Sequence, residues 1–102
     1  ISLQSATGIV RDYIFIDDTI LALRAIASAR PGGITNVASG VNLSNSEIAE
    51  LFARHGRTVQ FSRETARQKL PRANIARLLK FCSPPRHPLK VIGDWLDRNV
   101  VP

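Results

Sequence analysis

The alternation of apolar and polar positions along the chain predicts three short strands. β-branched and aromatic residues are concentrated in residues 9–16, 34–38 and 58–61, and this composition is typical of strands. Between and after these segments, apolar residues recur at helical spacing. The predicted order is strand, helix, strand, helix, strand, helix, helix, which describes a small α/β unit with more helix than sheet.

The first predicted helix has a start signal and a stop signal. Asp17-Asp18 offer an N-cap, so we expect Asp18 to cap the helix. Apolar residues then follow at helical spacing from Ile20 onward. The helix should end near Arg30, because the breaker sequence Pro31-Gly32-Gly33 comes next.

The later helices are predicted in the same way. The sequence Ser44-Asn45-Ser46-Glu47 is a capping box ahead of the second helix, and Gly56 is suited to close that helix. Apolar residues mark a short third helix within 75–79. The last helix is amphipathic over 89–96 and has Pro88 in its first turn, where proline is tolerated.

Several conspicuous side chains are expected to have structural roles. Tyr13 and Phe15 alternate with apolar residues, so we expect both in the core, and we expect Trp95 to anchor the last helix against it. Asn36 should bond to local backbone or cap a turn. Cys82 follows an apolar run and is interpreted as a buried structural thiol.

Composition places the chain among ordinary globular proteins. Its 102 residues, 44% of them hydrophobic and 22% charged, suit one small domain over 1–102. No apolar run reaches the ~18 residues of a membrane span, and we expect no membrane partner. A single cysteine excludes an internal disulfide and favours a reducing, cytoplasmic setting. His55 and His87 are too far apart in sequence for a metal motif.

Net charge adds the expectation of an anionic partner. The chain carries +6, and its basic residues are concentrated between Arg54 and Lys90, where Glu64 is the opposing carboxylate. Such a balance favours association with anions. By itself it leaves open nucleic acid, a phosphate ligand or a solvated basic face.

Three motifs in order carry a family resemblance. Residues 11–18 (RDYIFIDD) resemble the Arg-Asp-(Tyr/Phe)-(Ile/Val)-x-Val-x-Asp segment of extended short-chain dehydrogenases/reductases that act on sugar nucleotides. Residues 35–40 (TNVASG), followed by the capped helix of 44–51, are similar to that family's Tyr-Asn-(Val/Ile)-Gly-Ser-Gly strand and next helix. Residues 77–81 (RLLKF), followed by prolines, resemble its Arg-x-Leu-Gly-(Trp/Phe)-x-Pro. The resemblance extends from about residue 9 to 99.

The resemblance implies the carboxyl-terminal, substrate-binding part of an NAD-dependent epimerase/dehydratase. Such enzymes hold NAD or NADP on an N-terminal Rossmann half with a Gly-rich loop, and this chain has no such loop. Their catalytic pair is Tyr-x-x-x-Lys, whereas Tyr13 is followed four residues later by Asp17. We therefore expect a fragment without catalytic residues, whose partners are a nucleotide-sugar substrate and the missing Rossmann half. Cut from that half, it should expose apolar surface.

The same resemblance implies which side chains bind the substrate. Arg11 is expected at the diphosphate, to which a guanidinium can donate two parallel hydrogen bonds. Arg63 is the second candidate, although Thr65-Ala66 replace the Gly-Asp expected nearby, and Arg67 is an alternative to it. Ser44 corresponds to a position near the nucleotide base in some relatives.

Two other functions remain as alternatives. Residues 46–52 and the basic stretch after them superficially resemble a helix-turn-helix, in which a second helix would enter the DNA major groove. The chain could also be an interaction domain that kept the fold and lost the ligand. Ala38 in place of the usual glycine, and the missing Gly-Asp after Arg63, support that alternative, because both changes touch the expected nucleotide site.

Overall fold

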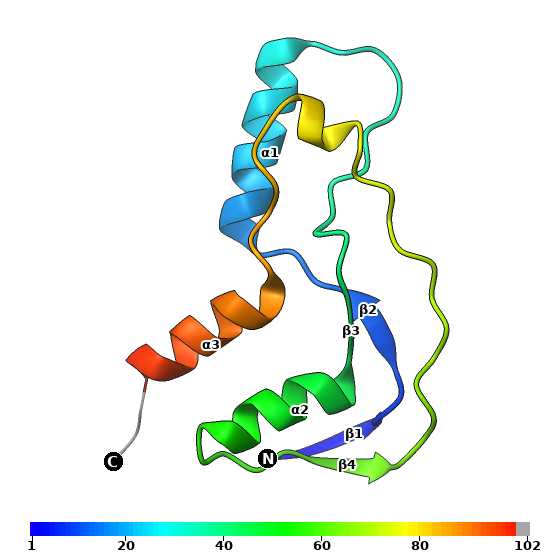
Figure 1. The fold of residues 1–102 in the computed structure, drawn as a ribbon, viewed down its shortest axis with the longest axis vertical. Helices are drawn as coiled ribbons and strands as arrows, with labels where there is room; N and C mark the ends of the chain where they lie inside the picture. The colour runs from blue at the N-terminus through cyan, green and yellow to red at the C-terminus, as the bar shows by residue number, and fades with distance from the viewer. Residues whose placement is uncertain (100–102) are drawn as a thin grey trace.

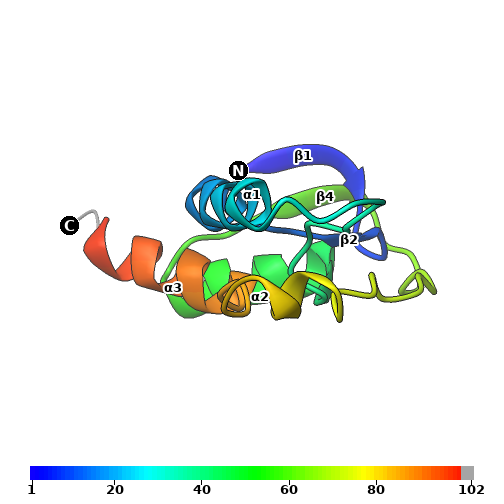
Figure 2. The same ribbon diagram turned by 90° about the horizontal axis from the view of Figure 1, so that it is seen from above.

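The computed structural model describes residues 1–99 and arranges them in two thin layers (Figures 1 and 2). One layer contains the first helix and the parallel strand pair, and the other contains the two later helices (Figure 2). The body measures 44 × 33 × 17 Å. Its elements in chain order are β1 (Ser2–Ala6), β2 (Val10–Asp12), α1 (Ile16–Ala29), β3 (Asn42–Ser44), α2 (Asn45–Arg54), β4 (Gln60–Arg63), the 3₁₀ turn η1 (Leu78–Lys80) and α3 (Pro88–Arg98).

The strands form two separate pairs in the part of the chain that the structure describes. β1 pairs with β4 in parallel, with Leu3 opposite Phe61. β2 pairs with β3 antiparallel, with Arg11 opposite Leu43. The result is a mixed α/β unit with short strands, as the sequence predicts, but without a continuous sheet.

A small apolar core joins these pieces. One buried apolar side chain comes from each of β1, β2, α1, β3, α2, η1 and α3. The buried apolar residues are Ala6, Val10, Ala22, Leu43, Leu51, Leu78 and Leu96. Because no element contributes a long buried stripe, each one is held by few apolar contacts.

The strand predictions are only partly correct. The strand expected over 9–16 is limited to β2, and the one expected over 58–61 is shifted to β4. The strand expected over 34–38 is wrong, because that segment is irregular and pairs with no other strand among residues 1–99. β1 and β3 were not predicted. Their sequences are short and partly polar, and each is formed by pairing with a distant segment.

The first helix has the expected end but a different start. Arg30 closes α1 in the left-handed conformation, with φ of 49°, as expected from the following Pro-Gly-Gly sequence. The N-cap is Phe15, whose side chain makes no capping hydrogen bond. The prediction that Asp18 caps the helix is wrong. Asp18 is buried in the first turn, and its carboxylate accepts hydrogen bonds from the Arg86 backbone N–H at 3.3 Å and Nε at 3.1 Å.

The capping predictions for the later helices are confirmed. Ser44 and Glu47 form the complete capping box of α2, and Gly56 follows that helix with φ of 76°. Pro88 occupies the first turn of α3, which is capped by His87. The third helix, expected within 75–79, is reduced to η1. No helix of residues 1–99 combines the length and the apolar character needed to cross a bilayer.

Some side-chain predictions are wrong. Trp95 is 48% exposed, and its neighbour Leu96, at 1%, anchors α3 instead. Asn36 does not bond locally: its amide donates to the carbonyl of Asn74, 38 residues later. Tyr13, Phe15 and Cys82 are each half-buried rather than fully in the core.

His55 joins the end of α2 to α3 through both of its ring nitrogens. Nδ1 lies 3.0 Å from the carbonyl oxygen of Leu51, and Nε2 lies 2.8 Å from Oδ1 of Asp97. Both partners are acceptors, so only the doubly protonated imidazolium can donate to both. The Leu51 carbonyl and then the Asp97 carboxylate raise the pKa of His55 above its ordinary value of 6.5, while Arg54 opposes the shift.

This contact should make stability depend on pH. A histidine whose pKa is higher in the folded state stabilises the fold fully below its unfolded pKa, and this contribution is lost as pH rises through the folded pKa. The melting temperature should therefore fall between pH 5.5 and pH 8.5, and His55→Gln should flatten that slope. His87→Asn, which keeps an N-cap acceptor, is the control. An unchanged slope in His55→Gln would contradict the prediction.

Candidate functional site

The turn between β1 and β2 is joined by hydrogen bonds to the loop that follows β4. The backbone N–H of Gly8 donates to Oγ1 of Thr65 at 3.0 Å, and the Gly8 carbonyl accepts from the Gln68 N–H at 2.7 Å. The Gln68 side chain then accepts from the backbone N–H of Val10 at 3.2 Å. These contacts fix the loop of residues 64–68 beside the start of β2, which carries Arg11.

Arg11 lies exposed at the centre of β2. Val10 before it and Leu43 opposite it are both buried, so the backbone of Arg11 is held in place. Its guanidinium makes no hydrogen bond or ion pair with any other of residues 1–99, and the alternative of a surface pair with Asp12 or Asp17 is not formed. A fixed backbone with an unpaired guanidinium is suited to bind an anion from solution.

Asp12 has a structural role instead. Its Oδ1 accepts from the backbone N–H of Ser39 at 3.0 Å and from the Ser39 hydroxyl at 2.8 Å. Its Oδ2 accepts from the N–H of Gly40 at 2.9 Å. The carboxylate thereby holds the turn that leads into β3 against β2, and it orients the strand that carries Arg11.

Asp12→Ala should therefore reduce stability. Hydrogen bonds to a charged group contribute roughly 1.5–3 kcal/mol, and part-buried donors left without a partner add a cost. We expect a loss of about 2 kcal/mol in the free energy of unfolding, measured by urea denaturation. Asp17→Ala is the matched control, because Asp17 is exposed in the first turn of α1. Equal stability of the two variants would contradict this role for Asp12.

Arg63 flanks the same turn from the other side. It is exposed at the end of β4, where it pairs with Ala6, and its carbonyl accepts from the N–H of Thr7 at 3.2 Å. Its guanidinium has no partner among residues 1–99. That Arg63 and Arg11 bind the same diphosphate therefore stays a prediction.

Ser44 and Arg67 belong to a different network. Oγ of Ser44 accepts from the Glu47 N–H at 3.1 Å and donates to the Glu47 carboxylate at 3.2 Å. That carboxylate forms an ion pair with Arg67, which also donates to the Asn42 carbonyl at 3.3 Å. Ser44 is only 3% exposed. The contact between Ser44 and a nucleotide base therefore stays a prediction, and a base would have to approach Ser44 past Glu47. The guanidinium of Arg67 is already bound to Glu47 and to the Asn42 carbonyl.

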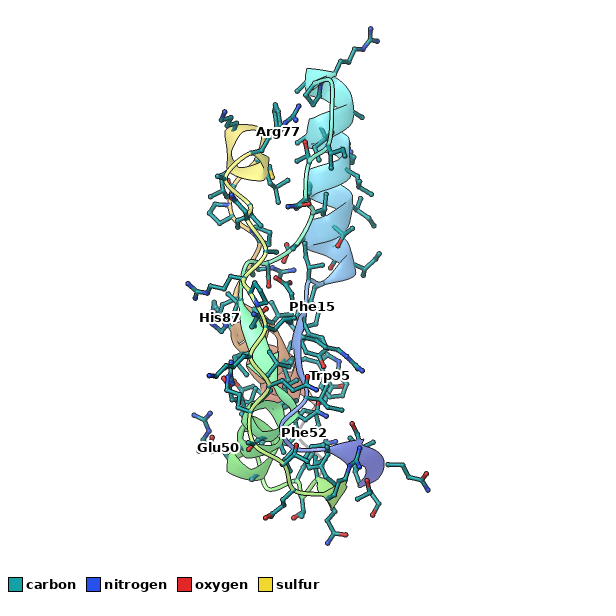
Figure 3. All side chains as sticks on the ribbon, turned by 90° about the vertical axis from the view of Figure 1, so that its right-hand side faces the viewer. Phe15, Glu50, Phe52, Arg77, His87 and Trp95 are labelled. Carbon is teal, nitrogen blue, oxygen red and sulfur yellow. The ribbon has the colours of Figure 1, made fainter. Side chains whose placement is uncertain are left out.

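Two further arginines are bound to other groups of the chain. Arg77 donates to the backbone carbonyls of Gly32 and Ile34, so it fastens the segment after α1 to η1 (Figure 3). Arg86 pairs with the buried Asp18. The long basic stretch is therefore not one binding surface, because several of its cations stabilise the chain's own carbonyls and carboxylates.

An open cavity lies beside β2 and β3. Its volume is about 640 Å³, within the range of small-molecule sites. Val10 and Asn42, which flank Arg11 and its partner Leu43 along the strands, contribute to it. Neither Arg11 nor Arg63 is among the residues that line it, which are Val10, Asn42, Arg67, Gln68, Lys69, Leu70 and Pro71.

Asn42 is the cavity residue that sequence reasoning missed. Its Nδ2 donates to the Leu70 carbonyl at 2.8 Å, while its Oδ1 is buried without a hydrogen-bond partner among residues 1–99. Buried polar atoms are usually paired, so this oxygen is a candidate acceptor for a ligand N–H. A lone asparagine between two polar segments gives no signal in the sequence.

The helix-turn-helix alternative is wrong. α2 is followed by strand β4 and then by an irregular loop, so no second helix occupies the position of a recognition helix. The basic residues of that loop are partly engaged with α2 and β3, as described for Arg67. The geometry therefore lacks the helix that would enter a DNA groove.

Comparison with known proteins shows the fold. No protein-family model and no curated protein matches the chain. Among solved structures, RMD from Pseudomonas aeruginosa, in a complex with NADPH, matches 95% of this chain with a TM-score of 0.67 and 24% sequence identity. The match covers 36% of the RMD chain. This chain thus shares its fold with about one third of a longer, NADPH-binding protein.

Proposed function

We propose that this chain is the nucleotide-sugar-binding part of an NAD(P)-dependent epimerase, dehydratase or reductase. The observation that carries the proposal is Arg11: its guanidinium is exposed and unpaired on a backbone held by β3, within a motif that resembles the diphosphate-binding segment of such enzymes. The fold shared with part of NADPH-bound RMD supports the assignment.

In this proposal Arg11 donates two hydrogen bonds to the substrate diphosphate. A guanidinium matches two phosphate oxygens, and charge-assisted bonds of this kind are about twice as strong as neutral ones. Arg63 would approach the same diphosphate across the turn. The nucleoside would extend toward the neighbouring cavity, where Asn42 offers a free acceptor. Binding energy at the diphosphate would position the reacting sugar for chemistry on the partner half.

The chain's own residues do not fit a dinucleotide. Rossmann sites bind the pyrophosphate of a dinucleotide at a helix N-terminus that has free backbone N–H groups and follows a Gly-rich loop. α1 carries Asp17 and Asp18 in its first turn, and the N-terminus of α2 is occupied by its capping box. Both sites would repel or exclude a pyrophosphate. We therefore assign NAD or NADP to a Rossmann half outside this chain, which is its proposed partner along with the nucleotide sugar.

An NMR chemical-shift titration with UDP, dTDP, GDP and CDP tests the proposal, with a short DNA duplex as the control. We expect one nucleotide to shift the amides around Arg11 and Arg63, together with the side-chain amide of Asn42. Shifts with DNA alone would overturn the proposal. A flat response to every nucleotide, repeated after addition of a Rossmann half, would favour the interaction-domain alternative.

A further inference from the structure

The segment of residues 82–87 runs from η1 back along α1 to the start of α3 (Figure 1). Ser83 near its start is exposed, and its hydroxyl makes no hydrogen bond within residues 1–99. Pro84 and Pro85 follow, and neither has a backbone N–H to donate. Because a proline restricts the residue before it to extended conformations, Ser83 presents a free hydroxyl on an extended stretch of backbone.

A buried acidic side chain lies beside the same segment. Asp18 of α1 and Ser83 both line a cavity of about 380 Å³ between α1 and this segment. The side chain of Asp18 is 10% exposed, and its carboxylate pairs with Nε of Arg86 at 3.1 Å. Within residues 1–99 this ion pair compensates the buried charge, and it joins α1 to the segment that leads into α3.

The sequence around Ser83 has the form that proline-directed Ser/Thr kinases recognise. Proline directly follows the serine, and a basic residue, Arg86, stands three positions after it. These enzymes bind the substrate as an extended segment, which the two prolines favour here. Ser83 is the one serine or threonine of the sequence that a proline follows. Ser28, by contrast, is exposed within α1, where a helical backbone does not fit such a site.

We propose that Ser83 is a phosphorylation site for a proline-directed kinase and that its phosphate weakens the contact between Asp18 and Arg86. In this reaction the Ser83 hydroxyl oxygen attacks the γ-phosphorus of Mg·ATP, and the bond from that phosphorus to the bridging oxygen of ADP breaks. The hydroxyl proton passes to a carboxylate base of the kinase. The products are the phosphoserine and ADP.

The effect on the fold follows from the charge of the phosphate. A phosphoserine carries about −1.5 to −2 at neutral pH, and such a group disrupts a structure when it lies beside a carboxylate. The cavity next to Ser83 already holds the buried Asp18, whose ion-pair partner is Arg86. Because a guanidinium binds a phosphate dianion strongly, the phosphate competes with Asp18 for Arg86. Asp18 then has a weaker partner, and α1 is held less firmly.

The site is tested by incubating the 102-residue chain with Mg·ATP and a kinase of the cyclin-dependent class. Tandem mass spectrometry then locates the phosphate. We expect it at Ser83, whereas Ser28 should remain unmodified. Pro84→Ala should lose most of the incorporation and Ser83→Ala all of it. Pro85→Ala is the matched control, because it keeps the proline directly after the serine, and it should be phosphorylated normally.

The effect on the fold is tested by thermal unfolding of the phosphorylated and unmodified chains. Phosphorylation should lower the melting temperature by about 5 °C. In Asp18→Asn, which removes the buried charge, the same phosphate should lower it less, because the repulsion is absent.

Two results would overturn the phosphorylation site: no phosphate at Ser83, or equal incorporation in Pro84→Ala and Pro85→Ala. A higher melting temperature after phosphorylation would overturn the competition for Arg86, because the guanidinium would then hold both anions. An equal loss in the Asp18→Asn variant would do the same. None of these outcomes depends on nucleotide binding, so the proposed function and this proposal fail separately.

Discussion

Replacing Gly8 with alanine should destabilise this chain by about 3 kcal/mol, at the upper end of the usual cost of overpacking. A Cβ at this position would overlap the carbonyl oxygen of Ala66 and lie 2.6 Å from Oγ1 of Thr65. The obstacle is largely backbone, which cannot rotate away as a flexible side chain could. The 64–68 loop would have to move off the turn, and the hydrogen bonds that join Gly8 to Thr65 and Gln68 would be lost.

Urea denaturation of Gly8→Ala measures this effect, and Gly32→Ala is the matched control. No atom lies within 4 Å of a Cβ placed at Gly32, so this change should be neutral or slightly stabilising through a less flexible unfolded chain. The Gly8 variant should also lose nucleotide-induced shifts at Arg63, because the loop that follows Arg63 would no longer be held. Similar stabilities for the two variants would show that the loop does not pack as described.

Arg11→Ala should weaken nucleoside-diphosphate binding by about 10- to 100-fold while changing the melting temperature little. The expected loss follows from roughly 1.5–3 kcal/mol for hydrogen bonds to a charged group and tenfold in affinity per about 1.4 kcal/mol. Stability should be preserved because the Arg11 guanidinium makes no hydrogen bond or ion pair with another described residue, whereas the strand is held by its buried neighbours.

Calorimetry with the nucleotide selected by the NMR titration measures the change in affinity. Arg11→Lys should recover part of the lost affinity, because an ammonium keeps the positive charge but cannot donate two parallel hydrogen bonds. Arg24→Ala, at an exposed arginine of α1, is the control and should bind normally. A large drop in melting temperature with unchanged affinity would mean that Arg11 is structural.

Local signals in the sequence determined both ends of α2, the start of α3 and the end of α1. The Ser44–Glu47 capping box, the closing Gly56 and Pro88 at the start of α3 act through contacts within one turn of helix. The same holds for the end of α1, where Arg30 adopts the left-handed conformation before Pro31. Such features need no distant partner, so a single sequence is enough to predict them.

Only the tertiary structure decided which segments became strands and which charges were free. β1 and β4 are 58 residues apart and form because they pair, while residues 34–38 have strand composition but pair with no strand among residues 1–99. In the same way, Asp18 is engaged by Arg86, and Arg67 by Glu47. Charge and spacing alone do not distinguish these arginines from Arg11, which only the motif of residues 11–18 singles out. The physical reason is that strand pairing and ion pairing join residues that are distant in the sequence. Which of these residues come together depends on the tertiary structure.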